Sequence, residues 1–151
     1  MGDNYLALRD VTFGYEPDKP VIDNIELSIH SGEQVALVGR NGAGKTTLFH
    51  MFVGLLVPQK GKVEVLGQAR GCERDFLEVR RHVALLFQNS EDQLFSPTVI
   101  EDVAFGPLNL GKSPTEAMAL AAEALIRVGM AGYEERISHH LSAGEMKLVA
   151  L

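Results

Sequence analysis

The stretch Gly39-Arg40-Asn41-Gly42-Ala43-Gly44-Lys45-Thr46 decides the fold of this chain, because it fits the pattern G-x-x-x-x-G-K-[ST] of a phosphate-binding loop. The run Val35-Ala36-Leu37-Val38 before it is uniformly apolar, which is typical of a buried parallel strand. Apolar residues recur at helical spacing after it, at Leu48, Met51, Phe52 and Leu55. Strand, loop and helix are the context that the motif requires, so the sequence predicts a site for a nucleoside triphosphate.

The residues of this loop have distinct predicted roles. Glycines let the backbone turn its N–H groups inward around an anion, and the helix N-terminus adds partial positive charge. We expect Lys45 to reach the β- and γ-phosphates and so to be catalytic, the Thr46 hydroxyl to ligate Mg²⁺, and Thr47 to touch the α-phosphate. The predicted nucleotide-binding residues of the loop are Gly39, Asn41, Gly42, Ala43, Gly44, Lys45, Thr46 and Thr47. The alternative, a glycine-rich turn with a chance lysine, is set aside because the flanking strand and helix patterns are both present.

Composition narrows the class of protein. The chain has 151 residues, of which 46% are hydrophobic, so it can bury a core of ordinary size. Its formal net charge is -6 and no run of Lys or Arg exceeds two, which argues against an extended nucleic-acid surface. The single cysteine, Cys72, excludes an internal disulfide, and the adjacent His139 and His140 have no further ligand at metal-site spacing. No signal peptide begins the chain and no apolar run approaches the ~18 residues of a membrane span, so we expect a cytosolic chain with peripheral membrane contact.

Alternating apolar and polar residues predict an antiparallel β region at the start of the chain. Two half-buried strands are expected over 6–13 and 25–29, and a third over 61–66, after the helix behind the loop stops near Pro58. Tyr15 lies just after the first strand. It can stack on an adenine face or be a core or turn tyrosine, and the pattern alone leaves both readings open.

A second uniformly apolar run covers residues 83–87 and predicts another buried parallel strand. It ends at Gln88, whose side chain is polar. Ligands of open α/β sheets bind outside the carboxyl ends of the strands. Gln88 is therefore a candidate ligand to Mg²⁺ or to an attacking water.

The C-terminal part of the sequence predicts helices. Residues 89–111 are irregular around a short helix over 99–105. The stretch Ser113-Pro114-Thr115-Glu116 predicts a capping box with proline at the first helical position, and Gly129 predicts the end of that helix. A helical region is therefore expected to follow the α/β part.

The stretch Leu141-Ser142-Ala143-Gly144-Glu145 has two readings. As local chemistry, Ser142 is a helix N-cap three residues before Glu145, which makes a second capping box. The same helix start leaves N–H groups beside a serine hydroxyl, an arrangement that also suits a phosphate.

Taken in order, the phosphate-binding loop, Gln88 after a second apolar run, a helical insert and the stretch 141–145 resemble the nucleotide-binding subunit of ABC transporters over essentially the whole chain. The order of these features carries the resemblance. The family's signature is Leu-Ser-Gly-Gly-Gln, so this chain matches it at Leu141, Ser142 and Gly144 and departs from it at Ala143 and Glu145.

Three further stretches resemble the ATPases of energy-coupling-factor and cobalt or nickel uptake systems. They are Leu86-Phe87-Gln88-Asn89, Asp92-Gln93-Leu94-Phe95 and Glu101-Asp102-Val103-Ala104-Phe105-Gly106-Pro107. The function implied is ATP binding and hydrolysis coupled to the uptake of a metal ion (cobalt or nickel) or a vitamin.

The resemblance implies a set of ligands and site residues. It implies that ATP and Mg²⁺ are bound, that Tyr15 stacks on the adenine, and that Gln88 is the catalytic Q-loop glutamine and a Mg²⁺ ligand. It implies that Ser142 and Gly144 meet the ATP held by the P-loop of a second ATP-binding subunit, in a homo- or heterodimer. The other implied partners are membrane-embedded transporter subunits and not nucleic acid, with the chain peripheral at the cytoplasmic face of the membrane.

The fold implied is an α/β P-loop NTPase core with an N-terminal antiparallel β subdomain and an α-helical subdomain, truncated before the Walker B strand. Residues 1–151 are expected to form one incomplete ABC-type nucleotide-binding domain. Within it, 1–88 hold the β subdomain and P-loop core, and 89–151 hold the Q-loop and helical subdomain with the signature. The family's catalytic glutamate and switch histidine follow the signature, so we expect negligible hydrolysis by the 151-residue chain alone.

Two other classes of function compete with a transport ATPase. A truncated module could hold nucleotide, or pair with a full-length partner, without turnover of its own. A P-loop kinase or GTPase is disfavoured, because the stretches around Gln88 and Ser142 would have no role in it and no Asn-Lys-x-Asp guanine-reading motif is present.

Overall fold

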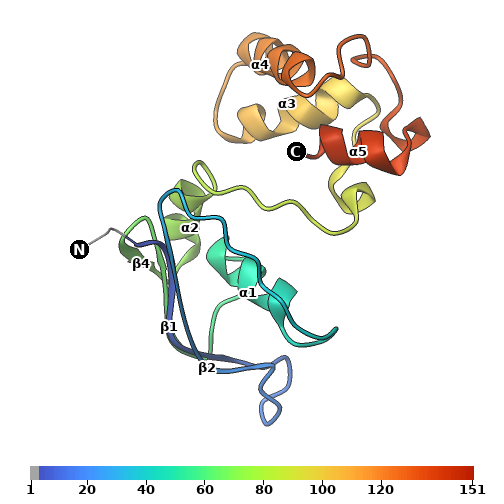
Figure 1. Ribbon diagram of the computed structural model, residues 1–151. Coiled ribbons are helices and arrows are strands. Elements are labelled where there is room, and N and C mark those ends of the chain that lie inside the picture. Colours follow the sequence, from blue (N-terminus) through green and yellow to red (C-terminus); the bar gives the residue numbers. More distant parts are fainter. Residues whose placement is uncertain (1–3) are drawn as a thin grey trace. The chain divides into compact units, whose positions relative to one another are not determined.

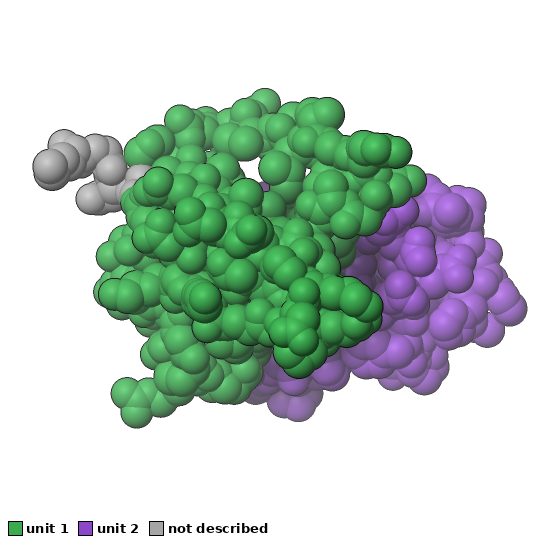
Figure 2. Space-filling model, turned by 90° about the horizontal axis from the view of Figure 1, so that it is seen from below, with its two compact units in different colours: residues 1–85 green, residues 86–151 purple. Residues whose placement is uncertain are grey.

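The computed structural model of the chain describes residues 4–151 (Figure 1). Its contacts divide it into two compact units, residues 1–85 and residues 86–151, which Figure 2 colours separately. Each unit has its own buried apolar cluster.

A four-stranded antiparallel sheet is the frame of the first unit. Its strands are β1 (Asn4–Phe13), β2 (Ile22–His30), β3 (Lys60–Val65) and β4 (Gln68–Arg70), in the order β2-β1-β3-β4. Leu8 pairs with Leu27 on one side and with Val63 on the other, which confirms the three strands predicted from alternation. The short β4 was not predicted, because three residues are too few to show a period.

Two helices cover one face of this sheet. They are α1 (Lys45–Phe52) and α2 (Glu73–Val79), and in Figure 1 both lie on the same side of it. Their apolar side chains meet those of the strands in one cluster, whose fully buried members include Leu8, Val11, Met51, Val63, Val65 and Val79. This packing anchors α1, and with it the loop that precedes α1, to the sheet.

The helix behind the loop is shorter than predicted. It ends at Phe52, because Gly54 takes the left-handed conformation (φ 74°) and the Leu55 N–H donates to the His50 carbonyl, which closes a Schellman motif. A side chain at Gly54 would also run into the Phe76 ring. The prediction that the helix continues to about Pro58 is therefore wrong.

The two predicted parallel strands are not formed. Residues 35–38 and 83–87 belong to no strand of the described chain, and Val38 is 90% exposed. An apolar run of this kind becomes a strand only when neighbouring strands accept and donate its backbone hydrogen bonds. Within residues 4–151 no strand pairs with either run, so both predictions are corrected here.

The second unit is helical. Its α-helices are α3 (Val99–Asn109), α4 (Pro114–Arg127) and α5 (Ala143–Val149), with short 3₁₀ turns η1 (Ser90–Gln93) and η2 (Ser138–His140). Three buried alanines, Ala104, Ala117 and Ala121, lie between α3 and α4 and allow these two helices to pack closely (Figure 1). A second cluster around Val99, Leu125 and Met146 joins α5 to them.

Most helix boundaries of this unit follow the predicted caps. Ser113 and Glu116 form the expected capping box at the start of α4, and Gly129, with φ 77°, follows its end. The third predicted boundary is wrong, because α3 runs past Phe105 and includes Pro107. Pro107 has no N–H to donate to the Val103 carbonyl, so the helix passes it with one backbone hydrogen bond missing. The end of α3 is then closed by the Leu110 N–H, which donates to the Gly106 and Pro107 carbonyls.

Candidate functional site

The loop before α1 has the backbone that an anion site needs. Gly42 and Gly44 have φ values of 79° and 84°, which only glycine adopts without strain. A Cβ at Gly44 would lie 2.5 Å from Ile22 Cδ1, so this position excludes a side chain for steric reasons as well. The first turn of α1 carries no acidic side chain, so its N-terminal N–H groups and helix dipole remain suited to a phosphate.

The Lys45 ammonium lies over this loop. Its Nζ donates hydrogen bonds to the carbonyls of Gly39 (2.7 Å) and Arg40 (2.8 Å). Lysine has three donors, and two of them are used here to close the loop on itself. An incoming phosphate oxygen therefore finds a cation already held at the loop, and can replace these carbonyls as the acceptor.

Tyr15 is fastened to the helix that follows the loop. Its hydroxyl shares a hydrogen bond of 3.2 Å with the buried Thr47 hydroxyl, and its ring meets Phe13 edge to face at 5.1 Å. The residue is nevertheless 65% exposed, so most of the ring faces solvent. The Tyr15 ring is therefore held in place by its hydroxyl and by Phe13, while its exposed face is available for a planar ligand to stack on. The Thr47 hydroxyl is bonded to Tyr15 in this arrangement.

The remaining loop residues lie in the same first unit. Thr46, the second residue of α1, is exposed, and so are Gly39, Asn41, Gly42 and Ala43. The eight predicted binding residues of the loop thus lie on one turn and the helix start that follows it, and the Tyr15 hydroxyl contacts this helix start at Thr47.

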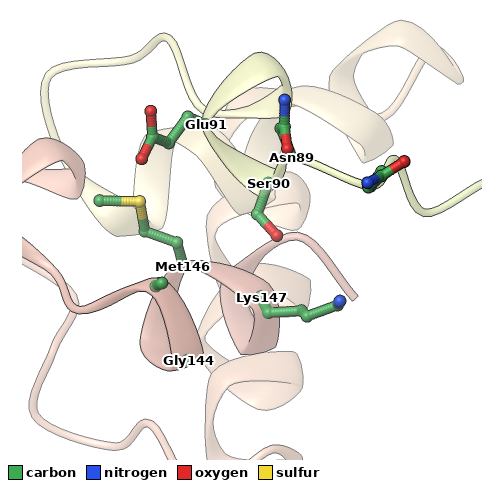
Figure 3. Close-up of a pocket in the computed structure, with 8 residues that line it drawn as sticks. Asn89, Ser90, Glu91, Gly144, Met146 and Lys147 are labelled. Atoms are coloured by element: carbon green, nitrogen blue, oxygen red, sulfur yellow. The ribbon is translucent and has the colours of Figure 1, made fainter.

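The second unit contains a cavity of about 540 Å³ between η1 and α5 (Figure 3). It brings together two residues predicted to belong to a nucleotide site, Gln88 and Gly144. The other lining residues are Asn89, Ser90, Glu91, Ala143, Met146 and Lys147. In Figure 3 the Ser90 side chain points from η1 towards α5, on which Lys147 supplies a positive charge.

Ser142 begins α5 and forms the predicted capping box. Its hydroxyl donates to Glu145 Oε2 (2.7 Å) and accepts from the Glu145 N–H (3.3 Å), while its own N–H donates to the same carboxylate (2.8 Å). The hydrogen bond from the Ser142 side chain, followed by those from the Ser142 backbone and from Tyr133, holds the pKa of Glu145 below its ordinary value. The carboxylate is therefore charged at neutral pH and is fixed to the serine.

One feature of the second unit was not predicted from the sequence. The Asp102 carboxylate accepts hydrogen bonds from the backbone N–H groups of Phe95 and Ser96 and from the hydroxyl of Ser138. Ser138 is fully buried. Phe95, Ser96 and Ser138 lie 7, 6 and 36 residues from Asp102, so no short sequence pattern predicts these hydrogen bonds.

Two further observations bear on the chemistry of residues 4–151. Within this range no group of three or more His, Cys, Asp and Glu side chains could hold a metal ion. No helix in the same range is both long enough and apolar enough to cross a membrane.

The sequence of this chain is similar to those of known ATP-binding transporter proteins. The chain is 47% identical over 147 residues to the energy-coupling factor transporter ATP-binding protein EcfA of Methanothermobacter thermautotrophicus, covering 97% of this chain and 47% of that protein. It is 45% identical over 151 residues to a putative ABC transporter ATP-binding protein of Nitratidesulfovibrio vulgaris, covering 99% and 55%. The chain thus spans about half the length of the curated relatives it matches.

A solved structure and a family model give the same result. The structure of cbiO1 from Clostridium perfringens, part of the ABC transporter complex cbiONQ, superposes with a TM-score of 0.82 at 31% identity, covering 98% of this chain and 59% of that one. The match supports the α/β P-loop NTPase fold predicted from the loop. The family model described as ABC transporter matches residues 22–151, which is most of the sequence. The chain therefore belongs to the ABC transporter family.

Proposed function

We propose that this chain acts as the ATP-binding subunit of an energy-coupling-factor type importer, and that it couples ATP binding and hydrolysis to uptake of a metal ion (cobalt or nickel) or a vitamin. The observation that carries the proposal is the loop over 39–46, with its left-handed glycines and the Lys45 ammonium at the start of α1. Similarity to EcfA and to cbiO1 supports the class of transporter.

Different residues of the loop are proposed to contact different parts of ATP. The backbone N–H groups of 39–44 surround the phosphates, and Lys45 exchanges its bonds to Gly39 and Arg40 for the β- and γ-phosphate oxygens. Thr46, exposed in the first turn of α1, would offer its hydroxyl oxygen to the Mg²⁺ that accompanies ATP, and the ion would offset the negative charge of the phosphates. Tyr15 presents its open ring to the adenine.

The second unit is proposed to contribute Gln88 and the turn carrying Ser142 to the reaction. Gln88, exposed at the cavity between η1 and α5, would orient the attacking water, and its side-chain amide oxygen would be available to Mg²⁺. Ser142 and Gly144 bind the γ-phosphate of the ATP held by a second ATP-binding subunit, so the active form is a homo- or heterodimer. The Ser142 and Gly144 contacts act on the charge of the transferring phosphoryl group, whereas Gln88 positions the water that attacks it, and phosphoryl-transfer enzymes gain rate from both effects.

The segment over 89–107 is proposed to contact membrane-embedded transporter subunits. Phe95 and Phe105 are 59% and 43% exposed, and large exposed aromatic side chains that lie together mark interaction surfaces. Such a contact places the chain at the cytoplasmic face of the membrane as a peripheral subunit.

A second candidate is a module that holds nucleotide without turning it over. Residues 39–47 contain no Asp or Glu, so the loop itself binds ATP but supplies no carboxylate to position or deprotonate water. Steady-state ATP hydrolysis by the full-length protein, abolished by Lys45→Ala, excludes this candidate.

ATP binding by the loop is tested most simply with Lys45→Ala. A charge-assisted hydrogen bond contributes on the order of 1.5 to 3 kcal/mol, so we expect ATP affinity to fall about 10- to 150-fold in calorimetric titrations of the full-length protein. Lys62→Ala is the matched control, because Lys62 is an exposed lysine on β3 of the same unit. Equal ATP affinities of the Lys45→Ala protein and the unmodified protein contradict the proposed function.

A further inference from the structure

The first turn of α3 joins three segments of the second unit through one carboxylate. Asp102 Oδ1 accepts from the backbone N–H groups of Phe95 (2.9 Å) and Ser96 (2.8 Å). Its other oxygen, Oδ2, accepts from the Ser138 hydroxyl. Asp102 therefore connects the chain just before α3 with the chain just before α5, through the two oxygens of a single side chain.

The role of this carboxylate is distinct from helix capping. The N-terminus of α3 is already capped by Thr98 and Glu101, whose carboxylate accepts from the Thr98 N–H (3.1 Å) and hydroxyl (2.8 Å). Asp102 is not needed for that purpose. All three of its side-chain bonds go to groups outside α3, so what it fixes is the position of those groups.

The segment bound to Oδ2 is held firmly. The backbone N–H of Val99 donates to Arg136 (3.0 Å) and that of Ile100 donates to Glu134 (3.0 Å), so the start of α3 also binds the chain over 134–136. Ser138 follows two residues later and is completely buried. The capping residue Ser142 comes only four residues after Ser138, and the Ser138 carbonyl accepts from the Leu141 N–H between them.

The segment bound to Oδ1 presents an aromatic side chain to solvent. The Phe95 ring meets Phe105 of α3 edge to face, with ring centroids 4.7 Å apart, and both residues are exposed. We refer to Phe95 and Phe105 as the aromatic pair. Because Asp102 holds the backbone of Phe95, a displacement of this pair pulls on the same carboxylate that holds Ser138.

We propose that Asp102 is a positioning residue that ties the exposed aromatic pair to the turn carrying Ser142, through its hydrogen bonds to Phe95, Ser96 and Ser138. It follows that whatever occupies or removes the aromatic pair alters the placement of Ser142. The consequence for catalysis rests on the role proposed above for Ser142, but the connection itself does not. Hydrogen bonds to a charged acceptor are strong enough to make this connection measurable.

The connection is tested by amide hydrogen exchange of the full-length protein without nucleotide. Phe95→Ala removes one ring of the pair, and we expect exchange at residues 141–144 to become about tenfold faster, because weakening one side of the cluster loosens the other. In a Ser138→Ala background the bond to Oδ2 is gone, so adding Phe95→Ala leaves exchange at 141–144 unchanged. In an Asp102→Ala background the carboxylate itself is missing, so adding Phe95→Ala is again expected to leave exchange at 141–144 unchanged.

Ser113→Ala is the matched control, since it removes a serine hydroxyl at a helix start in the same unit that has no bond to Asp102. In that background Phe95→Ala must still accelerate exchange at 141–144. An equal response to Phe95→Ala with and without the Ser138 hydroxyl overturns the proposal, and so does the absence of any response in the unmodified protein.

A parallel measurement separates this proposal from the proposed function. Ser138→Ala is expected to lower kcat for ATP hydrolysis while the KM for ATP, set at the Lys45 loop, stays the same. If the exchange result is obtained but kcat does not change, the connection stands and the catalytic role of Ser142 fails. If the exchange result is not obtained, the connection fails whatever kcat does.

Discussion

Two capping boxes in the helical unit have nearly the same local geometry. Ser113 with Glu116 begins α4, and Ser142 with Glu145 begins α5. In both, the serine hydroxyl donates to the glutamate Oε2 over 2.7 Å, and the glutamate N–H donates back to the hydroxyl over 3.3 Å. The hydrogen bonds between serine and glutamate are therefore nearly the same at the two helix starts.

Their surroundings differ. The pKa of Glu116 is lowered by its bonds to the Ser113 side chain and backbone and then by the charge of neighbouring Lys112, all within the same turn. The pKa of Glu145 is lowered by the equivalent Ser142 bonds and then by a hydrogen bond from Tyr133, a residue of another segment whose ring also holds the Arg136 guanidinium at 3.8 Å. The α5 box alone is connected to the rest of its unit.

The two boxes show that the same capping motif can be purely local or can lie beside groups from other segments. A capping box by itself stabilises one helix end, which is all that the α4 box does. Between the two residues of the α5 box lie Ala143 and Gly144, which line a cavity. After the Ser142 bonds, Tyr133 also lowers the pKa of the box glutamate. Ser138, which binds Asp102, lies four residues before Ser142. The predictions below compare the two boxes directly.

The largest difference is expected for a bulky cation at the capping serine. In the full-length protein, Ser142→Arg should abolish ATP hydrolysis, because the arginine side chain would obstruct closure of the proposed dimer, while ATP affinity of the monomer stays nearly unchanged. Ser113→Arg, the matched change at α4, should leave specific activity intact. Turnover assays and ATP titrations of both proteins check this. If Ser142→Arg lowers only the melting temperature and its specific activity persists, Ser142 is no more than a cap.

A smaller and equal effect is expected from removing each hydroxyl. Ser142→Ala and Ser113→Ala should each reduce the free energy of unfolding by about 0.5 to 2 kcal/mol, because each loses an N-cap. Urea denaturation curves measure both. The serine–glutamate bonds have the same lengths in the two boxes, so equal losses are expected. A loss of unfolding free energy in only one of the two variants contradicts this prediction.

The smallest effect is expected from acid. Both glutamate pKa values are lowered in the folded protein, so the stability that these carboxylates contribute is fully present above the ordinary glutamate pKa of about 4.3 and is lost as the pH falls through the lower folded value. Glu116→Gln and Glu145→Gln should each flatten the loss of stability at acid pH. Unfolding curves recorded over this pH range test the prediction. If the free energy of unfolding falls with pH in both variants as it does in the unmodified protein, the lowered pKa values of Glu116 and Glu145 are contradicted.

Local pattern was enough to predict the parts of the fold that depend on neighbouring residues. Alternation located β1, β2 and β3, and Ser-x-x-Glu spacing located both capping boxes. The loop over 39–46 was predicted from eight residues, and the left-handed Gly42 and Gly44 that shape it lie within those eight. These features need no information from distant parts of the chain.

The features that the sequence analysis missed depend on hydrogen bonds to distant or absent segments, or belong to an element too short to show a period. The apolar runs 35–38 and 83–87 indicate a need for burial, but a strand exists only where another strand pairs with it. The seven residues of α2 are too few for a helical period to stand out. The bond between Asp102 and Ser138 spans 36 residues, and neither residue belongs to a recognisable motif.

The measurement that tests the account most directly is the ATPase activity of a mixture of two inactive full-length proteins. One carries Lys45→Ala and keeps an intact Ser142, and the other carries Ser142→Arg and keeps an intact phosphate-binding loop. A dimer of one of each contains one site with both an unmodified loop and an unmodified Ser142, so mixing should partly restore hydrolysis that neither protein has alone. If mixed dimers form, as seen by differential tagging, and hydrolysis does not return, the loop and the Ser142 turn do not meet across a dimer.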